Sequence, residues 1–188
     1  MSKITLGVIA DTHVPDRAKK IPLAVLDLFS QRRVDAILHV GDLSTSRVLR
    51  QLGEIAPVHA IRGNTDLLLV GRLPWVRRLE FGDITIGMAH GHGSWLQYIP
   101  DKWHYIQYGP KKFSHYEELA RSQVPDCRVV VCGHTHLPAN YWQGEQLIFN
   151  PGSPTLPNAF VPGLPPSVGL LHIDIDNGNV MGEIVFLK

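Results

Sequence analysis

The chain has 188 residues, of which 44% are hydrophobic, so one domain can bury a core without a metal or a disulfide. Its 18 lysine and arginine residues nearly balance 17 aspartate and glutamate residues, which argues against non-specific binding of long nucleic acid. No stretch approaches the roughly 20 apolar residues of a membrane span, and the first apolar run is too short for a signal peptide. We expect one domain over residues 1–188, in the cytoplasm, with Cys127 and Cys132 reduced.

Buried strands and helices alternate through the first part of the chain. Continuous apolar runs, typical of strands buried on both faces, predict strands at 4–10, 36–40, 58–61, 84–89 and 129–132. Pro22 is expected to open a helix, because proline suits the first helical position. Ser44 is expected to cap a second helix that Gly53 ends. This β-α-β-α order is typical of an α/β fold.

The last part of the chain is richer in antiparallel strands. Two hairpins are predicted, one pairing 139–142 with 147–150 and one pairing 168–175 with 180–187. Asn177-Gly178 is a strong turn signal for the second of them. The five prolines between residues 154 and 166 predict an ordered loop over the surface.

Each of the five apolar runs ends in polar residues that can bind a metal. These residues are Asp11 and His13, Asp42, Asn64, His90, and His134 and His136. The carboxyl ends of strands meet at one edge of an open α/β sheet, so the side chains are expected to converge. The two donors of each i, i+2 pair should point the same way if the backbone is extended.

These donors outnumber what a single ion with open positions needs. Two ions that share one carboxylate would use all seven, and Asp42 is the natural bridge because it is a lone carboxylate among the donors. Carboxylate, amide and imidazole ligands without thiolate suit Mn, Fe, Ni or Zn rather than a structural zinc site.

Six short motifs occur in order along nearly the whole chain. They are Asp11-Thr12-His13, Gly41-Asp42, Gly63-Asn64-Thr65-Asp66, His90-Gly91-His92, Gly133-His134-Thr135-His136 and Asn150-Pro151-Gly152-Ser153. This series resembles the calcineurin-like metallophosphoesterases, in particular the small branch with the YfcE-type phosphodiesterases. The resemblance implies a four-layer α-β-β-α sandwich with mixed β-sheets and a dinuclear metal site at the carboxyl ends of the strands.

The resemblance also implies which residues hold each ion. Asp11, His13 and His136 would hold the first ion, Asn64, His90 and His134 the second, and Asp42 would bridge them. Manganese is the first expectation for both, with Ni, Fe, Co or Zn as alternatives. A hydroxide between two such ions attacks the phosphorus of an ester in line, and the metals stabilise the charge that develops.

The acid that would protonate the leaving group is not evident in the sequence. Many members of the wider family have histidine where this chain has Thr65. His92 is the first substitute, with Asp66 as a carboxylate that orients it. A role for His92 confined to hydrogen bonds within its own loop is the alternative.

An insertion at residues 93–116 combines aromatic and basic residues and is expected to act as a lid. Its rings are Trp95, Tyr98, Trp103, Tyr105, Tyr108, Phe113 and Tyr116. They could stack on a nucleotide base, while lysines contact phosphate. Alternatively, most of them pack against the domain or form the contact of a homo-oligomer.

A phosphodiesterase that acts on small, nucleotide-like phosphate esters is the first functional hypothesis. Diesters are favoured over monoesters because the sequence offers no arginine cluster to neutralise a dianionic phosphate. The rival is a non-catalytic scaffold that binds proteins, like the retromer subunit of the same fold. A complete set of seven donors argues against it. A nuclease for long nucleic acid is disfavoured by the neutral charge balance.

Overall fold

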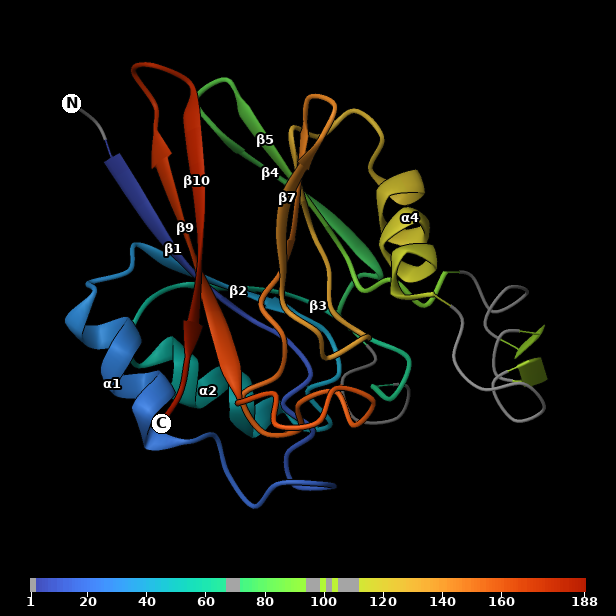
Figure 1. The fold of residues 1–188 in the computed structure, drawn as a ribbon. Coiled ribbons are helices and arrows are strands. Elements are labelled where there is room, and N and C mark those ends of the chain that lie inside the picture. Colours follow the sequence, from blue (N-terminus) through green and yellow to red (C-terminus); the bar gives the residue numbers. More distant parts are fainter. Residues whose placement is uncertain (1–2, 67–71, 94–98, 101–102, 105–111) are drawn as a thin grey trace.

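The fold is built on two five-stranded mixed sheets, seen in a computed structural model that describes residues 3–66, 72–93, 99–100, 103–104 and 112–188 (Figure 1). The first sheet has the order β10-β9-β1-β2-β3 and the second β4-β5-β6-β8-β7. The first contains β1 (Lys3–Ile9), β2 (Ala36–Val40), β3 (Val58–Ile61), β9 (Ser167–Asp174) and β10 (Asn179–Phe186). The second contains β4 (Val76–Phe81), β5 (Ile84–Ala89), β6 (Val129–Val131), β7 (Ala139–Gln143) and β8 (Gln146–Asn150).

Each sheet combines three neighbouring parallel strands with antiparallel pairs. In the first sheet β1, β2 and β3 are parallel, β9 pairs antiparallel with β1, and β10 pairs antiparallel with β9. In the second sheet β5, β6 and β8 are parallel, while β4 and β7 pair antiparallel with β5 and β8. The carboxyl ends of the parallel strands are therefore the place where a shared site can form.

Three buried clusters separate four layers. One lies between the sheets, where Leu6 and Val8 of the first sheet share a cluster with Ile86 of the second. A second lies between the first sheet and the helices α1 (Leu23–Gln31) and α2 (Ser46–Gly53). A third packs helix α4 (Phe113–Gln123) on the second sheet. This confirms the expected α-β-β-α sandwich.

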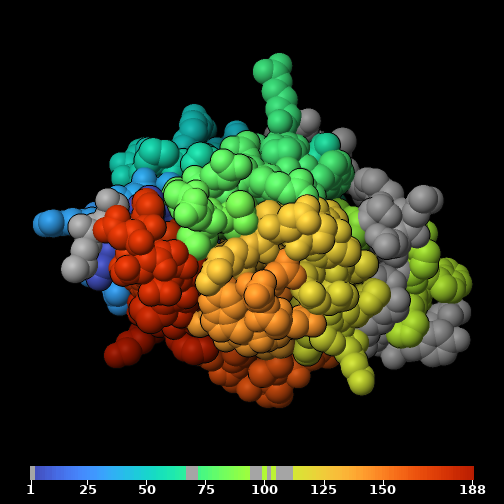
Figure 2. All heavy atoms as spheres, turned by 90° about the horizontal axis from the view of Figure 1, so that it is seen from above, coloured from blue at the N-terminus to red at the C-terminus, as the bar shows by residue number. Residues whose placement is uncertain are grey.

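The hairpin turns lie at the end of the molecule away from the ends of the parallel strands. Figure 2 looks onto this end, where β4–β5 (green), β7–β8 (orange) and β9–β10 (red) meet. A side chain at Gly82, in the turn before β5, would collide with Ile175 after β9, so these two turns touch. The loops that follow β1, β2 and β5 lie at the other end.

All of the predicted strands are present, with bounds that agree or differ by one residue. Strand β4 was missed, because VRRLEF carries two arginines and is only partly buried. The prediction that Ser44 caps the second helix is wrong. Thr45 is the N-cap residue and accepts a hydrogen bond from the Arg47 N–H, while the Ser44 N–H donates to Asp66 at 2.8 Å.

The expected insertion at 93–116 is described only in part. Residues 94–98, 101–102 and 105–111 lie outside the described residues, so most of the aromatic rings named for a lid do too. Residues 113–116 form the first turn of α4. Both cysteines are free thiols and buried. Among the described helices, none combines the length and the apolar composition needed to cross a membrane.

Candidate metal centre

The loops after five strands bring the predicted donors together. Backbone hydrogen bonds connect these loops: the Asp11 N–H donates to Gly41 O and the Gly133 N–H to His90 O, at 3.0 and 3.1 Å. The first bond joins the loops after β1 and β2, and the second joins the loops after β5 and β6. A third bond connects the two sheets. His90 Nδ1 lies 2.7 Å from Val40 O, so a residue of the second sheet is hydrogen-bonded to the first.

One group of donors consists of Asp11, His13 and His136, whose ligand atoms lie within 4.8 Å of one another. His13 Nε2 and His136 Nε2 are 3.3 Å apart. His136 Nε2 also lies 3.4 Å from Asp11 Oδ1. His136 Nδ1 is hydrogen-bonded to Leu156 O, which leaves Nε2 as the acceptor of a neutral ring.

A second group consists of Asp11, Asp42 and His90, which are all buried. His90 Nε2 lies 3.4 Å from Asp42 Oδ1 and 3.8 Å from Asp11 Oδ1. Asp42 Oδ2 lies 3.6 Å from His13 Nε2. The two oxygens of Asp42 therefore face different groups, one toward His13 and one toward His90.

Asn64 and His134 complete the set. Asn64 Oδ1 lies 3.0 Å from His134 Nδ1, and the rings of His134 and His90 are 5.3 Å apart at their centroids. All seven predicted donors thus lie around one place in the fold.

The backbone at the donors is left-handed rather than extended. The φ angles are 53° at Asp11, 45° at His13, 68° at His134 and 55° at His136, so the extended backbone assumed from the sequence is wrong. Asp42 has the same conformation, with φ 54°. Such angles cost a non-glycine residue on the order of 1–3 kcal/mol each and persist only where the surrounding structure holds them.

The segment after β8 holds these strained loops in place. Ser153 Oγ donates to Asp11 O at 2.8 Å, and Thr155 Oγ1 donates to Thr12 O at 2.9 Å. Asn150 Nδ2 donates to Gly133 O and Asn158 Nδ2 to Thr135 O. The motif Asn150-Pro151-Gly152-Ser153 therefore contacts the loops that carry the donors.

The charges of the donors are strongly coupled. Burial raises the pKa of Asp11 to about 6, against the opposing effect of His136 and His90. Burial alone would raise the pKa of Asp42, but the charges of His90 and His13 and a hydrogen bond from the Thr65 N–H hold it well below its usual range. Burial alone would lower the pKa of His90, but Asp42 and Asp11 raise it to about 9. Asp42 is therefore the carboxylate that stays ionised.

We expect the metal-free protein to lose stability in acid. Burial lowers the pKa of His39, His92 and His134 to about 3, so below about pH 6.5 only the unfolded chain protonates these rings. Each then removes up to about 1.4 kcal/mol of unfolding free energy per pH unit. Asp11 opposes the loss between about pH 4 and 6, and Asp66, whose pKa is also raised by burial, acts in the same direction. Burial also lowers the pKa of His13, so four histidines outweigh two carboxyl groups. His90 stabilises the fold in full below about pH 6.5, and this contribution is lost as the pH rises through about 9.

Thermal unfolding in a chelator therefore should show its highest midpoint near neutral pH. The acid slope should become shallower in a His39→Gln variant, because one of the four rings is removed. A midpoint that increases steadily from neutral pH toward pH 5 would contradict these protonation states.

The arrangement fits divalent cations. His90 Nε2 is buried and has no hydrogen-bond partner among the described residues, although it faces two carboxylates. Its Nδ1 is held by a backbone carbonyl, which is the usual support for a metal-binding imidazole. The close approach of His13 Nε2 and His136 Nε2 is explained in the same way, since both can face one ion.

The two residues proposed for proton transfer lie in different positions. His92 is adjacent to the donors, with its ring 5.5 Å from that of His90. Asp66 accepts the backbone N–H groups of Ser44 and Gly63 at 2.8 and 2.9 Å, so its carboxylate holds the loops after β2 and β3. His39, in β2, is buried with Nε2 3.2 Å from Thr12 Oγ1, in the loop between Asp11 and His13.

Two residues near the centre were not recognised in the sequence. The Arg62 guanidinium lies 4.0 Å from the centroid of the Trp75 ring, and this ring lies 5.2 Å from that of His92. Arg62 directly precedes Gly63-Asn64, and this position was the only signal that could have identified it.

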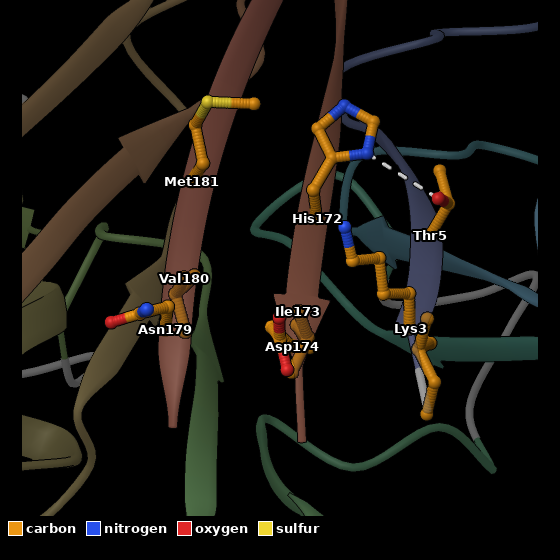
Figure 3. Close-up of a pocket in the computed structure, with 9 residues that line it drawn as sticks. Lys3, Thr5, His172, Ile173, Asp174, Asn179, Val180 and Met181 are labelled. Atoms are coloured by element: carbon orange, nitrogen blue, oxygen red, sulfur yellow. Dashed lines mark hydrogen bonds between the residues drawn. The ribbon is translucent and has the colours of Figure 1, made fainter. Parts of the chain in front are cut away.

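A separate hollow of about 210 Å³ lies near the start of β1, far from these donors (Figure 3). Lys3, Thr5 and His172 line it. His172 Nδ1 lies 3.3 Å from Thr5 Oγ1 and its Nε2 lies 3.2 Å from Glu183, so this histidine connects β9 with β1 and β10. None of the seven donors lines this hollow.

Comparison with known proteins agrees with the site. A probable metallophosphoesterase of Methanothermobacter thermautotrophicus is 36% identical over 169 residues, 90% of this chain and 86% of that protein. Wild-type Vps29 of Entamoeba histolytica, complexed with Zn²⁺, has a TM-score of 0.68 and 26% identity and covers 97% of this chain and 99% of its own. The E. coli phosphoesterase YfcE shares the fold, with a TM-score of 0.60 and 22% identity over 98% of this chain and 100% of its own. Residues 4–176 match the calcineurin-like phosphoesterase superfamily domain, so the chain belongs to this superfamily.

Proposed function

We propose that the protein is a metal-dependent phosphodiesterase that uses two divalent cations. The observation that carries this proposal is the convergence of seven oxygen and nitrogen donors, four of them buried and three partly buried, from loops after five strands. A protein that only needed the fold would have no reason to keep buried carboxylates and imidazoles facing one another, because unpaired buried charge is costly.

The donors divide between two ions. Asp11, His13 and His136 form a compact group that would hold the first ion. His90, with Asn64 and His134 beside it, would hold the second. Asp42 would bridge, since its two oxygens face His13 and His90 separately. Manganese is our first choice for both ions, and the zinc in the complex of the related Vps29 makes zinc the main alternative.

The bound ions would lower the pKa of water and neutralise charge on the phosphoryl group. The chain's residues supply the rest of the chemistry. Asp42 remains a carboxylate because nearby histidines hold its pKa low, and it can therefore offset the charge of two cations. Asp66 fixes the loops that carry Asp42 and Asn64 through hydrogen bonds to Ser44 and Gly63.

His92 is the residue proposed to assist the leaving group. Its ring lies beside His90 and Trp75, at the border of the donor cluster. Burial lowers its pKa to about 3, so the ring is neutral at neutral pH. A neutral ring donates a hydrogen bond from the nitrogen that carries its proton, and this bond would stabilise the charge that develops on the leaving alkoxide or phenoxide, which then takes its proton from water.

The remaining parts of the proposal concern the substrate and the domain. We propose small phosphodiesters, including nucleotide-like ones, as substrates, and residues 1–188 as one domain in which 93–116 forms a lid. A cytoplasmic location and a homo-oligomer are parts of the same proposal. No role is proposed in binding long nucleic acid.

A protein-binding scaffold is the second candidate, favoured by the likeness to Vps29 at 26% identity. The two candidates differ in what metal binding achieves. An enzyme hydrolyses esters only when the ions are bound, whereas a scaffold binds metal without turnover.

We expect close to two ions per chain and metal-dependent hydrolysis of diesters. Metal analysis after dialysis against Mn²⁺ gives the number of ions per chain. Hydrolysis rates are measured for p-nitrophenyl phosphate, its bis-ester and the phenylphosphonate ester, each with Mn, Ni, Co, Zn and Mg. The bis-ester should be hydrolysed faster than the monoester. Two bound ions without hydrolysis of any ester would favour the scaffold, and a plateau at one ion would refute the dinuclear site.

A further inference from the structure

Arg62 lies next to the metal centre at the point where the edges of the two sheets meet. It follows β3, the edge strand of the first sheet, and directly precedes Gly63 and Asn64. Its backbone N–H donates to Pro74 O at 3.0 Å, just before β4, the edge strand of the second sheet. Both its position and its backbone bond therefore place it at one side of the donor loops.

The side chain of Arg62 is positioned by an aromatic ring and has no acidic partner among the described residues. Its guanidinium lies 4.0 Å from the centroid of the Trp75 ring, an arrangement that fixes a cation by its contact with an aromatic face. The described residues provide it with no ion pair, and its buried Nε has no hydrogen-bond partner among them. A partly buried guanidinium without an acceptor is costly, so an acceptor that binds there is strongly favoured.

Trp75 directs this cation toward the donors. The pairing of Val76 with Ala89 places Trp75 opposite His90 at the end of β5. Trp75 directly precedes β4, and its ring contacts the guanidinium of Arg62, the residue that follows β3 of the first sheet. The Trp75 ring lies 5.2 Å from the His92 ring, which is 5.5 Å from that of His90.

We propose that Arg62, supported by Trp75, binds a non-bridging phosphate oxygen of the substrate. The inference rests on the proposed phosphoesterase function and narrows its substrate class. A guanidinium fork matches phosphate oxygens, and it stays charged at any relevant pH. One arginine beside two cations suits the single negative charge of a phosphodiester better than the double charge of a terminal phosphate. The sequence shows no arginine cluster, and the structure places a single arginine, Arg62, beside the donor loops.

The test compares Arg62→Ala and Arg62→Lys with Arg78→Ala. Arg78 is an exposed arginine two residues beyond Val76 on β4, and its side chain donates to Gln123 O near the end of α4. Arg78→Ala removes the same charge as Arg62→Ala, but on the side of β4 that contacts α4, away from Arg62. All proteins are used loaded with Mn²⁺, after metal analysis has shown equal ion content.

We expect Arg62→Ala to raise KM for bis(p-nitrophenyl) phosphate by about 10- to 100-fold, the usual effect of losing a charge-assisted hydrogen bond. The inhibition constant of inorganic phosphate should increase in parallel. Millimolar guanidinium chloride should restore part of the activity of Arg62→Ala and have no such effect on Arg62→Lys or Arg78→Ala. Arg62→Lys should show an intermediate KM, because it keeps the charge and loses the fork.

An Arg62→Ala variant with unchanged KM and unchanged phosphate inhibition overturns the inference while leaving the proposed function intact. If the wild-type protein hydrolyses no ester, calorimetric binding of inorganic phosphate to the Mn²⁺-loaded proteins decides the point instead. Weaker binding by Arg62→Ala then supports the anion site, and equal binding refutes it. Should Arg62→Ala fail to fold, the same comparison is made with Arg62→Lys, for which equal phosphate binding again counts against the inference.

Discussion

Replacing Asp42 with asparagine is expected to remove hydrolysis almost completely, by about 1000-fold or more in kcat, whereas Asn64→Ala should cause a milder loss. The two oxygens of Asp42 face His13 and His90, one in each proposed ion site. Asn64 Oδ1 lies beside His134, within the second proposed ion site. A bridging carboxylate holds two ions and neutralises part of their charge, and metal stabilisation of the transition state is worth several kcal/mol.

The measurement is steady-state hydrolysis of a diester with metal analysis of each variant. Asp42→Asn keeps the shape of the side chain but removes the charge that supports His90, so its unfolding midpoint in a chelator should be lower than that of the wild type, and metal analysis separates lost turnover from lost metal. Asp11→Asn is the informative companion, because Asp11 belongs to both compact groups of donors. A larger loss in Asp11→Asn, with a mild loss in Asp42→Asn, would make Asp11 the bridge.

The centre of the fold could be predicted from the sequence because its strands are buried on both faces. β2 consists of five consecutive buried residues, and such a run has few other interpretations. β4 was missed for the opposite reason, since an edge strand with charged residues shows no clear apolar pattern. The cap at Ser44 was wrong because a contact with Asp66, 22 residues later, fixes this serine outside the helix.

The donors could be predicted as a set, but their supports could not. A polar residue after an apolar run can be seen in the sequence, and seven such residues in order are informative. The left-handed backbone at Asp11 and His134 cannot be predicted from the sequence, because most aspartates and histidines do not adopt it, although both adopt it more often than other non-glycine residues. The hydrogen bond from Ser153 to Asp11 and the contact of Arg62 with Trp75 join segments that no periodicity relates.

Gly63→Ala is expected to disable the metal centre although it adds only a methyl group. The added Cβ would overlap Asp42 Oδ1 and would lie 2.6 Å from the Asp42 backbone nitrogen and 2.7 Å from His90 Nε2. Real Cβ atoms essentially never come so close, so Asp42 or His90 must move. Both residues are buried on all sides and cannot move far without disturbing their neighbours. The backbone of Gly63, unlike that of Gly41, is not in the left-handed region, so the collision alone is responsible.

Gly53→Ala is the matched control, because a side chain at this position meets nothing within 4 Å. Gly53 ends α2, where alanine is favoured over glycine by about 0.5–1 kcal/mol, so this variant should be as stable as the wild type or slightly more so. For Gly63→Ala we expect fewer than two ions per chain, a loss of kcat of at least about 100-fold, and a lower unfolding midpoint in Mn²⁺, since bound ligand stabilises the folded state. The midpoint in a chelator separates the two effects, because damage limited to the metal site should leave it closer to the wild-type value. If Gly63→Ala binds two ions and turns over diesters like Gly53→Ala, the close packing of Gly63 against Asp42 and His90 does not control the site.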